Sequence, residues 1–273
     1  MARPYTVRDY LRDYWAISLL VLLFALGVLL YLAGWRLGQG GMPVRAGELV
    51  LEGVPSGTYA YIDQTRRIPA HGGTARSDLT PGSHTVIVDA PGFQPWNELF
   101  AIESGKDTVL RPILVPKEPE PRTLHGEERS AGAAAILAFG IPTKAAPLSM
   151  EGGCALVYVA NGRVLADATT TPECAAPEYL LCPVEEGGAR TEACPSSTVI
   201  FPATEHIESV SPFPSRDDAV IVAAGGSSFV IELDPREPQF VSPLLKGPRM
   251  RAAPWSATSI VISDTKQVYE LPL

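Results

Sequence analysis

Residues 79–93 read LTPGSHTVIVDAPGF and contain the best strand signal in the chain. Four consecutive β-branched residues, Thr85–Val88, favour extended backbone, and Pro-Gly pairs on both sides predict the turns that bound the strand. Other short runs nearby are apolar or alternating, without helical periodicity. They are ELVLEGV from Glu48, TYAYID from Thr58, ELFAI from Glu98 and TVLRPILV from Thr108. Together these runs predict a small antiparallel β-sandwich over residues 48–115.

The same segment resembles the PEGA domain, a small extracytoplasmic β-sandwich. That family opens with Pro-Glu-Gly-Ala and a strand ending Ile-Asp. It continues with Leu-x-Pro-Gly-x-His/Tyr-x-Val-x-Val and then Gly-Tyr/Phe. The matching positions in this chain are Pro55, Gly57, Ile62, Asp63, Leu79, Pro81, Gly82, His84, Val86, Val88, Gly92 and Phe93. The chain departs from the pattern with Ser56 for Glu, Thr58 for Ala, and a loop RRIPAHGGTARS where Gly-x-Thr-Pro is usual.

The resemblance implies a single-pass membrane protein of the bacterial envelope type with a propeller-like C-terminal region. The matched prolines and glycines are expected to set turns, and the alternating valines to fill a core. His84 is expected to be an ordinary strand residue rather than a ligand or a catalyst.

Residues 14–35 read YWAISLLVLLFALGVLLYLAGW and contain no charged residue. A helix of this length spans about 33 Å, against a hydrocarbon core of about 30 Å. Aromatic residues at both ends match the interfacial belts of a spanning helix. A cleaved signal peptide is the alternative, but its apolar region is usually about 7–15 residues long. Tyr31 also lies where the cleavage site requires a small residue. We therefore predict a transmembrane helix that contacts the lipid bilayer through residues 14–35.

The arginines that flank this helix predict its orientation. Arg3, Arg8 and Arg12 precede it, whereas Arg36 and Arg45 follow it. Under the positive-inside rule this difference favours a cytoplasmic N-terminus. Residues 1–13 are then cytoplasmic. The Gly-rich residues 36–47 are predicted to be a short flexible stalk on the outer side of the membrane.

All four cysteines fall within one window far from the helix. Because an even, clustered set outside the cytosol is typical of disulfides, we predict two of them. The intervening spacings of 19, 7 and 11 residues lack the close pairs of a zinc site. Zinc ligation and four reduced thiols remain the alternatives, and the pairing is open. The candidates are Cys154, Cys174, Cys182 and Cys194.

The region after the sandwich carries a weak repeat. Residues 116–130 are charged and rich in proline, which predicts a semi-rigid linker. Strand–turn–strand units then begin at Pro147, Pro212 and Pro254, and the last two starts are 42 residues apart, as in propeller blades. We predict a β-rich, propeller-like domain over residues 131–273, with a Cys-containing insertion at 169–197. AAAILAFGI, residues 133–141, is predicted to add a strand or a short helix.

Three such units are too few for a closed propeller, which needs four to eight blades. The predicted fold class is therefore mainly β: an N-terminal transmembrane helix, a small antiparallel sandwich and an incomplete propeller. Exposed sheet edges need a cover. A partner chain, self-association or packing on the sandwich would supply it.

Composition and motifs limit the functions that the chain can have. The formal net charge of −8 argues against nucleic-acid binding. No nucleotide, hydrolase or metalloprotease motif is present, and the four histidines lack metal spacing. Asp217-Asp218 and Gly225-Gly226 are interpreted as β-turn residues rather than a cation site or a phosphate loop. We predict no enzyme activity, no catalytic or metal-binding residues and no cofactor.

The prediction that remains is a membrane-anchored, extracytoplasmic binding or scaffold protein that contacts an envelope protein or cell-wall glycan. Trp96 and Trp255 are the aromatic residues considered for contact with a partner, although packing is favoured for Trp96. Two alternatives stay open. One is a hydrolase or hydrolase fragment on a propeller scaffold, and the other is a structural or sensory subunit of an envelope machine.

Overall fold

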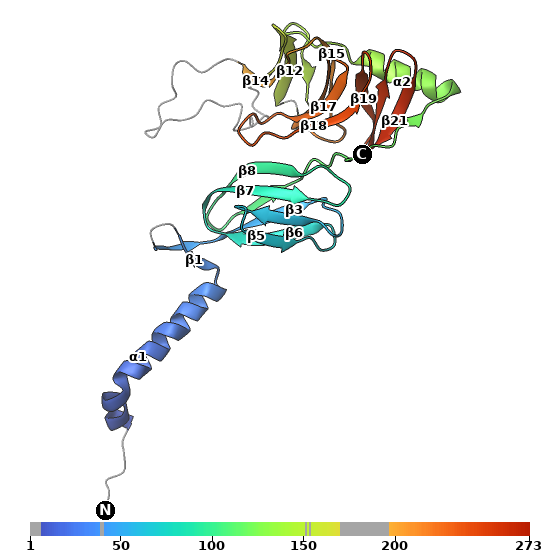
Figure 1. Ribbon diagram of the computed structural model, residues 1–273. Helices are drawn as coiled ribbons and strands as arrows, with labels where there is room; N and C mark the ends of the chain where they lie inside the picture. The colour runs from blue at the N-terminus through green and yellow to red at the C-terminus, as the bar shows by residue number, and fades with distance from the viewer. Residues whose placement is uncertain (1–6, 39–40, 151, 153, 170–196) are drawn as a thin grey trace, which may run out of the picture.

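The computed structural model describes residues 7–38, 41–150, 152, 154–169 and 197–273. The protein is mainly β, with an apolar N-terminal helix followed by several antiparallel sheets, which confirms the predicted fold class. Figure 1 shows three parts in chain order: the helix α1, a small sandwich, and a C-terminal domain that rests on the sandwich.

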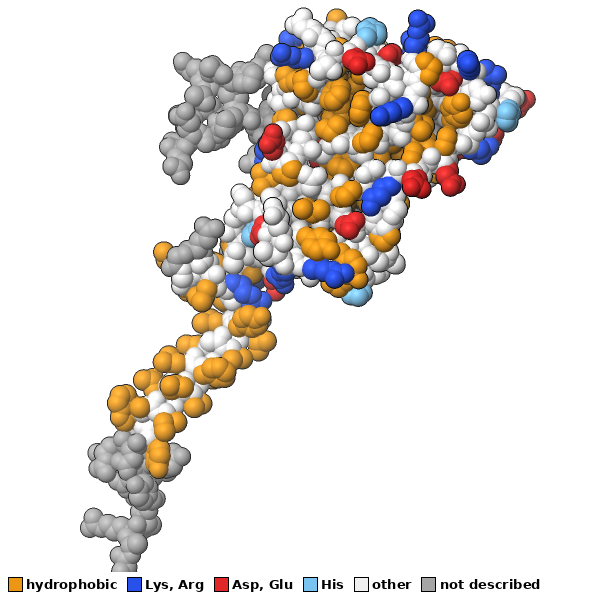
Figure 2. All heavy atoms as spheres, viewed as in Figure 1, with side chains coloured by type: hydrophobic (Ala, Val, Ile, Leu, Met, Phe, Trp, Pro, Cys, Tyr) orange, Lys and Arg blue, Asp and Glu red, His pale blue; other side chains and the backbone are white. Residues whose placement is uncertain are grey.

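Helix α1 comprises Val7–Leu32 and projects away from the rest of the protein (Figure 1). Its segment Tyr14–Leu32 is long and apolar enough to cross a membrane, and none of the other described residues buries it. On the face shown in Figure 2, hydrophobic side chains cover this segment. The helix ends before the predicted Trp35 because Gly34 adopts a positive φ of 83°, the left-handed conformation that commonly terminates helices.

The predicted stalk forms a β-hairpin instead of a flexible chain. Strand β1 (Trp35–Leu37) pairs antiparallel with β2 (Pro43–Arg45). The Gly-rich sequence suggested flexibility, but glycine also allows the positive φ of 75° that Gly41 adopts just before β2. The chain is therefore folded immediately after α1.

The sandwich has one three-stranded sheet, in the order β6-β3-β9, and one four-stranded sheet, in the order β5-β4-β7-β8. The strands are β3 (Gly47–Glu52), β4 (Tyr59–Ile62), β5 (Arg66–Pro69), β6 (Thr74–Leu79), β7 (Gly82–Asp89), β8 (Trp96–Ile102) and β9 (Asp107–Leu110). Strand β7 contains the stretch that predicted this fold, and its Val86 and Val88 are buried in the core as expected.

Two details of the sandwich differ from the sequence prediction. The stretch treated as a loop, RRIPAHGGTARS, contributes β5 and the first part of β6. Its arginines point outward and only Ile68 of β5 is buried, so the apolar alternation that would reveal an edge strand is weak. In addition, β9 pairs parallel with β3, so the sandwich is not wholly antiparallel.

The C-terminal domain contains three four-stranded antiparallel sheets, each resembling a propeller blade. The three predicted strand–turn–strand units are confirmed as neighbouring strand pairs of these sheets. The first sheet has β11 (Leu148–Ser149), β12 (Ala155–Ala160), β13 (Arg163–Ala168) and β14 (Thr198–Pro202). The second has β15 (Ile207–Pro212), β16 (Ala219–Ala224), β17 (Ser227–Glu232) and β18 (Val241–Lys246). The third has β19 (Arg251–Ser256), β20 (Ser259–Ser263), β21 (Val268–Pro272) and β10 (Arg122–Thr123).

Two hairpin turns inside these sheets are explained by their own residues. Asn161-Gly162 joins β12 to β13, and Gly225-Gly226 joins β16 to β17. All four residues have positive φ, as a two-residue hairpin turn of type I′ requires. The expectation that Gly225-Gly226 forms a hairpin rather than a phosphate loop is therefore confirmed.

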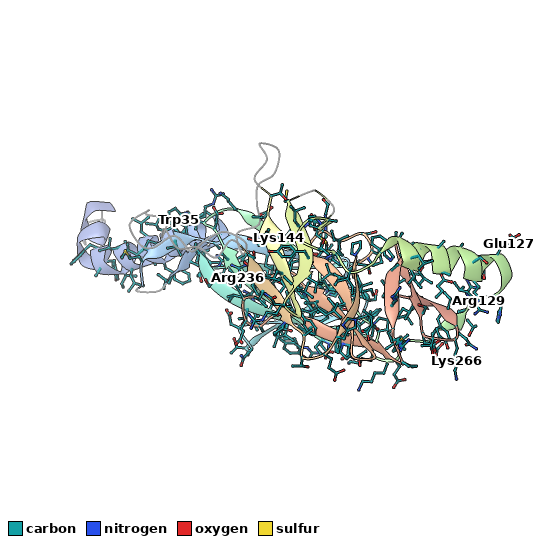
Figure 3. The ribbon with its side chains drawn as sticks, turned by 90° about the horizontal axis from the view of Figure 1, so that it is seen from above. Trp35, Glu127, Arg129, Lys144, Arg236 and Lys266 are labelled. Carbon is teal, nitrogen blue, oxygen red and sulfur yellow. The ribbon has the colours of Figure 1, made fainter. Side chains whose placement is uncertain are left out.

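The sheets pack face to face. One apolar cluster joins the first sheet to the second, and a larger one joins the second to the third. The far face of the third sheet is covered by helix α2 (Gly126–Ala138), whose Ile136 packs with Val261 and Val268. Arg129 of α2 also donates a hydrogen bond to the Lys266 carbonyl at 3.1 Å, and both residues lie at the α2 end of the molecule (Figure 3). Helix α2 thus takes the place that a neighbouring blade would occupy.

The second half of the predicted linker belongs to the C-terminal domain. Arg122 of β10 pairs with Glu270 of β21, and α2 begins at Gly126. A two-residue strand that pairs with the far end of the chain has no local sequence signal, so proline and charge dominated the prediction. The stretch 133–141, predicted as a strand or a helix, is helical up to Ala138.

Candidate functional site

A polar pocket lies where the sandwich meets the second sheet of the C-terminal domain. Its volume is about 390 Å³. Strands β8 and β9 contribute one wall, and the turn 215–218 together with the end of β17 contributes the other. The pocket therefore contains side chains from parts of the chain that are more than 100 residues apart in sequence.

Two glutamates dominate this pocket. Glu98 follows Trp96 by two residues on β8, so its side chain lies on the same face of the strand, toward the sandwich interior. Glu232 is the last residue of β17 and is only 5% exposed. The two carboxyl groups are hydrogen-bonded to one another. Because a carboxylate only accepts, one member of the pair must be protonated for this bond to form.

The surroundings of the two glutamates favour the protonated form of the pair. Burial, followed by the charge of Glu98, raises the pKa of Glu232 to about 10. Burial is also the largest cause that raises the pKa of Glu98 to about 7, and the charges of Asp234 and Asp218 add to it. At neutral pH the pair as a whole retains a proton, as expected for two like charges that share one site.

Two arginines stand beside the pair, but each is bound to its own aspartate. Arg216 contacts Asp218 at 2.6 Å, and Arg236 contacts Asp234 at 2.5 Å. Arg216 also donates a hydrogen bond to the backbone carbonyl of Arg111, at the end of β9. Arg236 lies on the side of the C-terminal domain opposite α2 (Figure 3). The glutamate pair is thus compensated mainly by its own proton.

The pocket lies within a packed contact between the two modules. The Asn97 amide donates to the Pro238 carbonyl at 3.4 Å, beside the pocket. A single apolar cluster contains residues of the sandwich, such as Val115, and residues of the second and third sheets, such as Phe240 and Leu271. The glutamate pair is therefore a polar element in a largely apolar interface between sandwich and blades.

This arrangement can hold and release a proton, and it can present carboxyl oxygens to a polar ligand. Trp96 lines the pocket, and its indole N–H has no hydrogen-bond partner in the described part of the chain. Among the described residues, no group of three or more His, Cys, Asp or Glu side chains has the geometry to hold a metal ion.

Two aromatic residues were considered for contact with a partner. Trp96 is 1% exposed, so it packs in the core as favoured from the sequence, and the alternative contact role does not hold. It lies on the inward face of an edge strand, where a large ring closes the sandwich. Trp255 is half-buried and packs against the cluster under α2. Neither side chain is a free surface aromatic.

The predicted turn at Asp217-Asp218 is present, but Asp218 is more than a solvated turn former. Its carboxylate is paired with Arg216. Asp217 and Asp218 both line the pocket, although Asp217 is the more exposed of the two. The residues that sequence reasoning missed are Glu98 and Glu232. The signals available were a glutamate at an inward position of ELFAI and another at the end of the apolar run FVIE.

One of the four candidate cysteines, Cys154, lies among the described residues. Cys154 is disulfide-bonded. Cys174, Cys182 and Cys194 lie outside the described residues, as does most of the insertion predicted at 169–197. The prediction of two disulfides and their pairing stays a prediction.

No family model matches this chain, and no curated protein does. Among solved structures, the Bacillus anthracis TIE protein matches with a TM-score of 0.23 and 13% sequence identity, over 84% of this chain and 43% of that one. The chain thus spans less than half the length of that protein. A likeness at this TM-score has no bearing on fold or function, and the PEGA resemblance stays a prediction.

Proposed function

We propose that this chain is a single-pass, membrane-anchored protein of the bacterial envelope with a non-enzymatic binding or scaffold role. The observation that carries the proposal is α1, whose apolar surface is exposed along its whole described length. Exposed apolar surface of this extent is stable in lipid and not in water. Residues 1–13 would be cytoplasmic, and everything after the helix would be extracytoplasmic.

The arrangement of the other parts supports a scaffold. The sandwich, which we propose to be PEGA-like, shares an apolar core with the C-terminal sheets. The two modules would therefore move as one body on the end of the helix. Such a body is suited to holding a binding surface at a fixed height above the membrane. Its partner would be another envelope protein or cell-wall glycan.

The edges of the blades make one mode of binding less favourable. Strands β14 and β18 are edge strands of their sheets, and they contain Pro202 and Pro243. Proline cannot donate to a new ladder, so it protects an edge from pairing with another chain. We therefore place the partner contact on side chains rather than on added strands. Two exposed apolar residues of the C-terminal domain are suitable probes, Ile141 and Val241.

The test uses the full chain in its native membrane. A photoreactive benzoylphenylalanine is placed at position 141 or 241, the cells are irradiated, and the adducts are identified by mass spectrometry. A recurring protein or glycan adduct from either position supports the proposal. If neither position, nor a third probe at exposed Tyr59 of the sandwich, captures an envelope component, the binding role is contradicted.

A second candidate function is favoured by the glutamate pair alone. Two carboxyl groups that share a proton are the arrangement by which some hydrolases activate water. Glycosidases keep their two carboxyl groups about 5 Å or more apart, so a directly hydrogen-bonded pair fits peptide hydrolysis better. The test is peptide hydrolysis by the full chain in detergent, compared with Glu232→Gln. Activity that disappears in the variant would establish this candidate, and no activity in the wild-type protein would remove it.

A further inference from the structure

The hairpin β1–β2 exposes apolar side chains directly beside the end of α1. Leu37 is 75% exposed and Met42 is 70% exposed, whereas Trp35 is 39% exposed. In a hairpin the register fixes which residues are neighbours, and here Leu37 pairs with Pro43. The described residues of the hairpin therefore expose apolar side chains, although they belong to the part of the chain that would leave the membrane.

The hairpin and the helix share one groove of about 440 Å³. Leu30 and Tyr31 of α1 form one side of the groove, and Trp35 and Leu37 form the other. Gly27 lies at its lower end and leaves it open, since no atom lies within 4 Å of the position where a Cβ would stand. A groove with such walls is suited to a hydrocarbon chain and has little to offer a polar ligand.

The hairpin is held at a defined angle. The Arg36 guanidinium stacks over the Tyr31 ring at 4.0 Å and donates a hydrogen bond to the Tyr31 carbonyl at 2.7 Å. The same guanidinium pairs with Asp78 of β6 at 3.0 Å. One arginine therefore connects the helix end, the hairpin and the sandwich. The exposed apolar residues of β1 are therefore held in a fixed position at this junction.

We propose that the hairpin β1–β2 is a second membrane-contacting element, which lies in the interfacial layer of the outer leaflet with a lipid acyl chain in the groove. The inference rests on the proposed membrane anchoring of α1. The groove has α1 as one of its walls, so the lipid that surrounds the helix also reaches the hairpin. Tyr31 and Trp35 then occupy the headgroup level, where aromatic rings are favoured.

This contact would fix the orientation of the ectodomain. A lone helix followed by a flexible stalk leaves the attached domain free to tumble. When a helix and a hairpin both enter the leaflet, the hairpin has a fixed orientation relative to the membrane. The Arg36–Asp78 ion pair then holds the sandwich in a fixed orientation relative to the hairpin. The blades are then presented to the cell wall in one direction.

The test is photochemical labelling of the full chain reconstituted in vesicles of phosphatidylcholine and phosphatidylglycerol. Benzoylphenylalanine replaces Met42 in the hairpin, Leu29 within the helix, or Leu137 on α2. Leu137 is 74% exposed and serves as the matched exposed control in the C-terminal domain. We expect lipid adducts from positions 29 and 42, and a yield at position 42 several-fold above that at position 137.

Each outcome decides a different claim. Adducts at position 29, with a yield at position 42 no higher than at position 137, would overturn the hairpin contact and leave the anchor intact. No adduct at position 29 would overturn the proposed anchoring, and the inference with it. Because Met42 and Leu137 are both exposed, neither replacement disturbs a packed core.

Discussion

The carboxyl group of Glu98, on strand β8 of the sandwich, is hydrogen-bonded to that of Glu232, at the end of β17 in the second blade. The contact joins two modules that are distant in sequence, and it exists only while the pair holds a proton. Most buried charges in proteins are compensated by an opposite charge. Here a shared proton takes the place of the opposite charge, so we expect the stability of the interface to depend on pH.

The first prediction concerns that pH dependence. Both folded-state pKa values are raised above the ordinary glutamate value of 4.5, so the native form binds more protons than the unfolded chain. The contribution of the pair to stability is therefore fully present below about pH 4.5, and it is lost as pH rises from there through about 7 toward about 10. Thermal unfolding of the full chain in detergent, followed across this range, measures the effect. A melting temperature that rises from neutral to alkaline pH would contradict it.

The second prediction assigns the pH dependence to the pair. In Glu232→Gln the amide donates to Glu98 at every pH and no second charge is buried. We expect the variant to melt several degrees above the wild-type protein at about pH 9, with a flatter pH profile. Glu205→Gln removes an exposed carboxylate of the same domain and is the matched control. Equal slopes in the wild-type protein and Glu232→Gln would show that other groups carry the dependence.

The third prediction concerns the contact of α2 with the third sheet. A Cβ at Gly132 would stand 3.0 Å from Val261 and Val268 and 3.1 Å from Leu124. Gly132→Val should therefore push the helix off the sheet and reduce the free energy of unfolding by about 1–3 kcal/mol. Gly140→Ala is the control, because no atom lies within 4 Å of its Cβ position. Chemical denaturation with similar midpoints for the two variants would contradict the close approach.

The fourth prediction concerns the carboxylate of Asp63. The Asp63 carboxylate accepts the Thr85 backbone N–H at 3.0 Å and lies 2.7 Å from the His84 imidazole. Burial of Asp63 opposes ionisation, but these hydrogen bonds outweigh it and lower the pKa of this carboxyl below its ordinary value of 3.8. Asp63→Asn keeps a residue that tolerates the positive φ found there, so it isolates the loss of charge.

We expect Asp63→Asn to cost about 1 kcal/mol near neutral pH, since the site is partly exposed and screened. The stabilisation from a lowered pKa is present above about pH 4 and is lost as pH falls through the folded-state pKa, so the variant and the wild-type protein converge in acid. Urea denaturation at two pH values measures this. A difference that persists unchanged at low pH would mean that charge is not its cause.

The sequence predicted those parts of the fold whose signals are local. Three segments determine the structure of their own residues: the β-branched run 85–88, the uncharged stretch that begins at Tyr14, and the two-residue turn at Gly225-Gly226. The strands β5 and β10 were missed because their stability comes from pairing with other strands rather than from their own residues. The hairpin β1–β2 was missed because glycine is common both in turns and in flexible chains, so the composition did not distinguish the two.

The candidate site could not be predicted from the sequence. Glu98 and Glu232 are separated by more than a hundred residues, and neither belongs to a motif. The two side chains meet because the sandwich packs against the C-terminal domain. The spacing of apolar residues along the sequence does not predict that packing. Trp96 shows the same limit, because an aromatic residue on an edge strand has the same pattern whether it packs inward or meets a partner.

The central claim is that α1 anchors an extracytoplasmic sandwich and blade domain. Protease treatment of right-side-out membrane vesicles tests it most directly, with one epitope fused before Met1 and another after Leu273. We expect the C-terminal epitope to be digested in intact vesicles, and the N-terminal epitope to stay with the membrane and be protected until the vesicles are lysed. Protection of the C-terminal epitope, or loss of the N-terminal one from the mature chain, would contradict it.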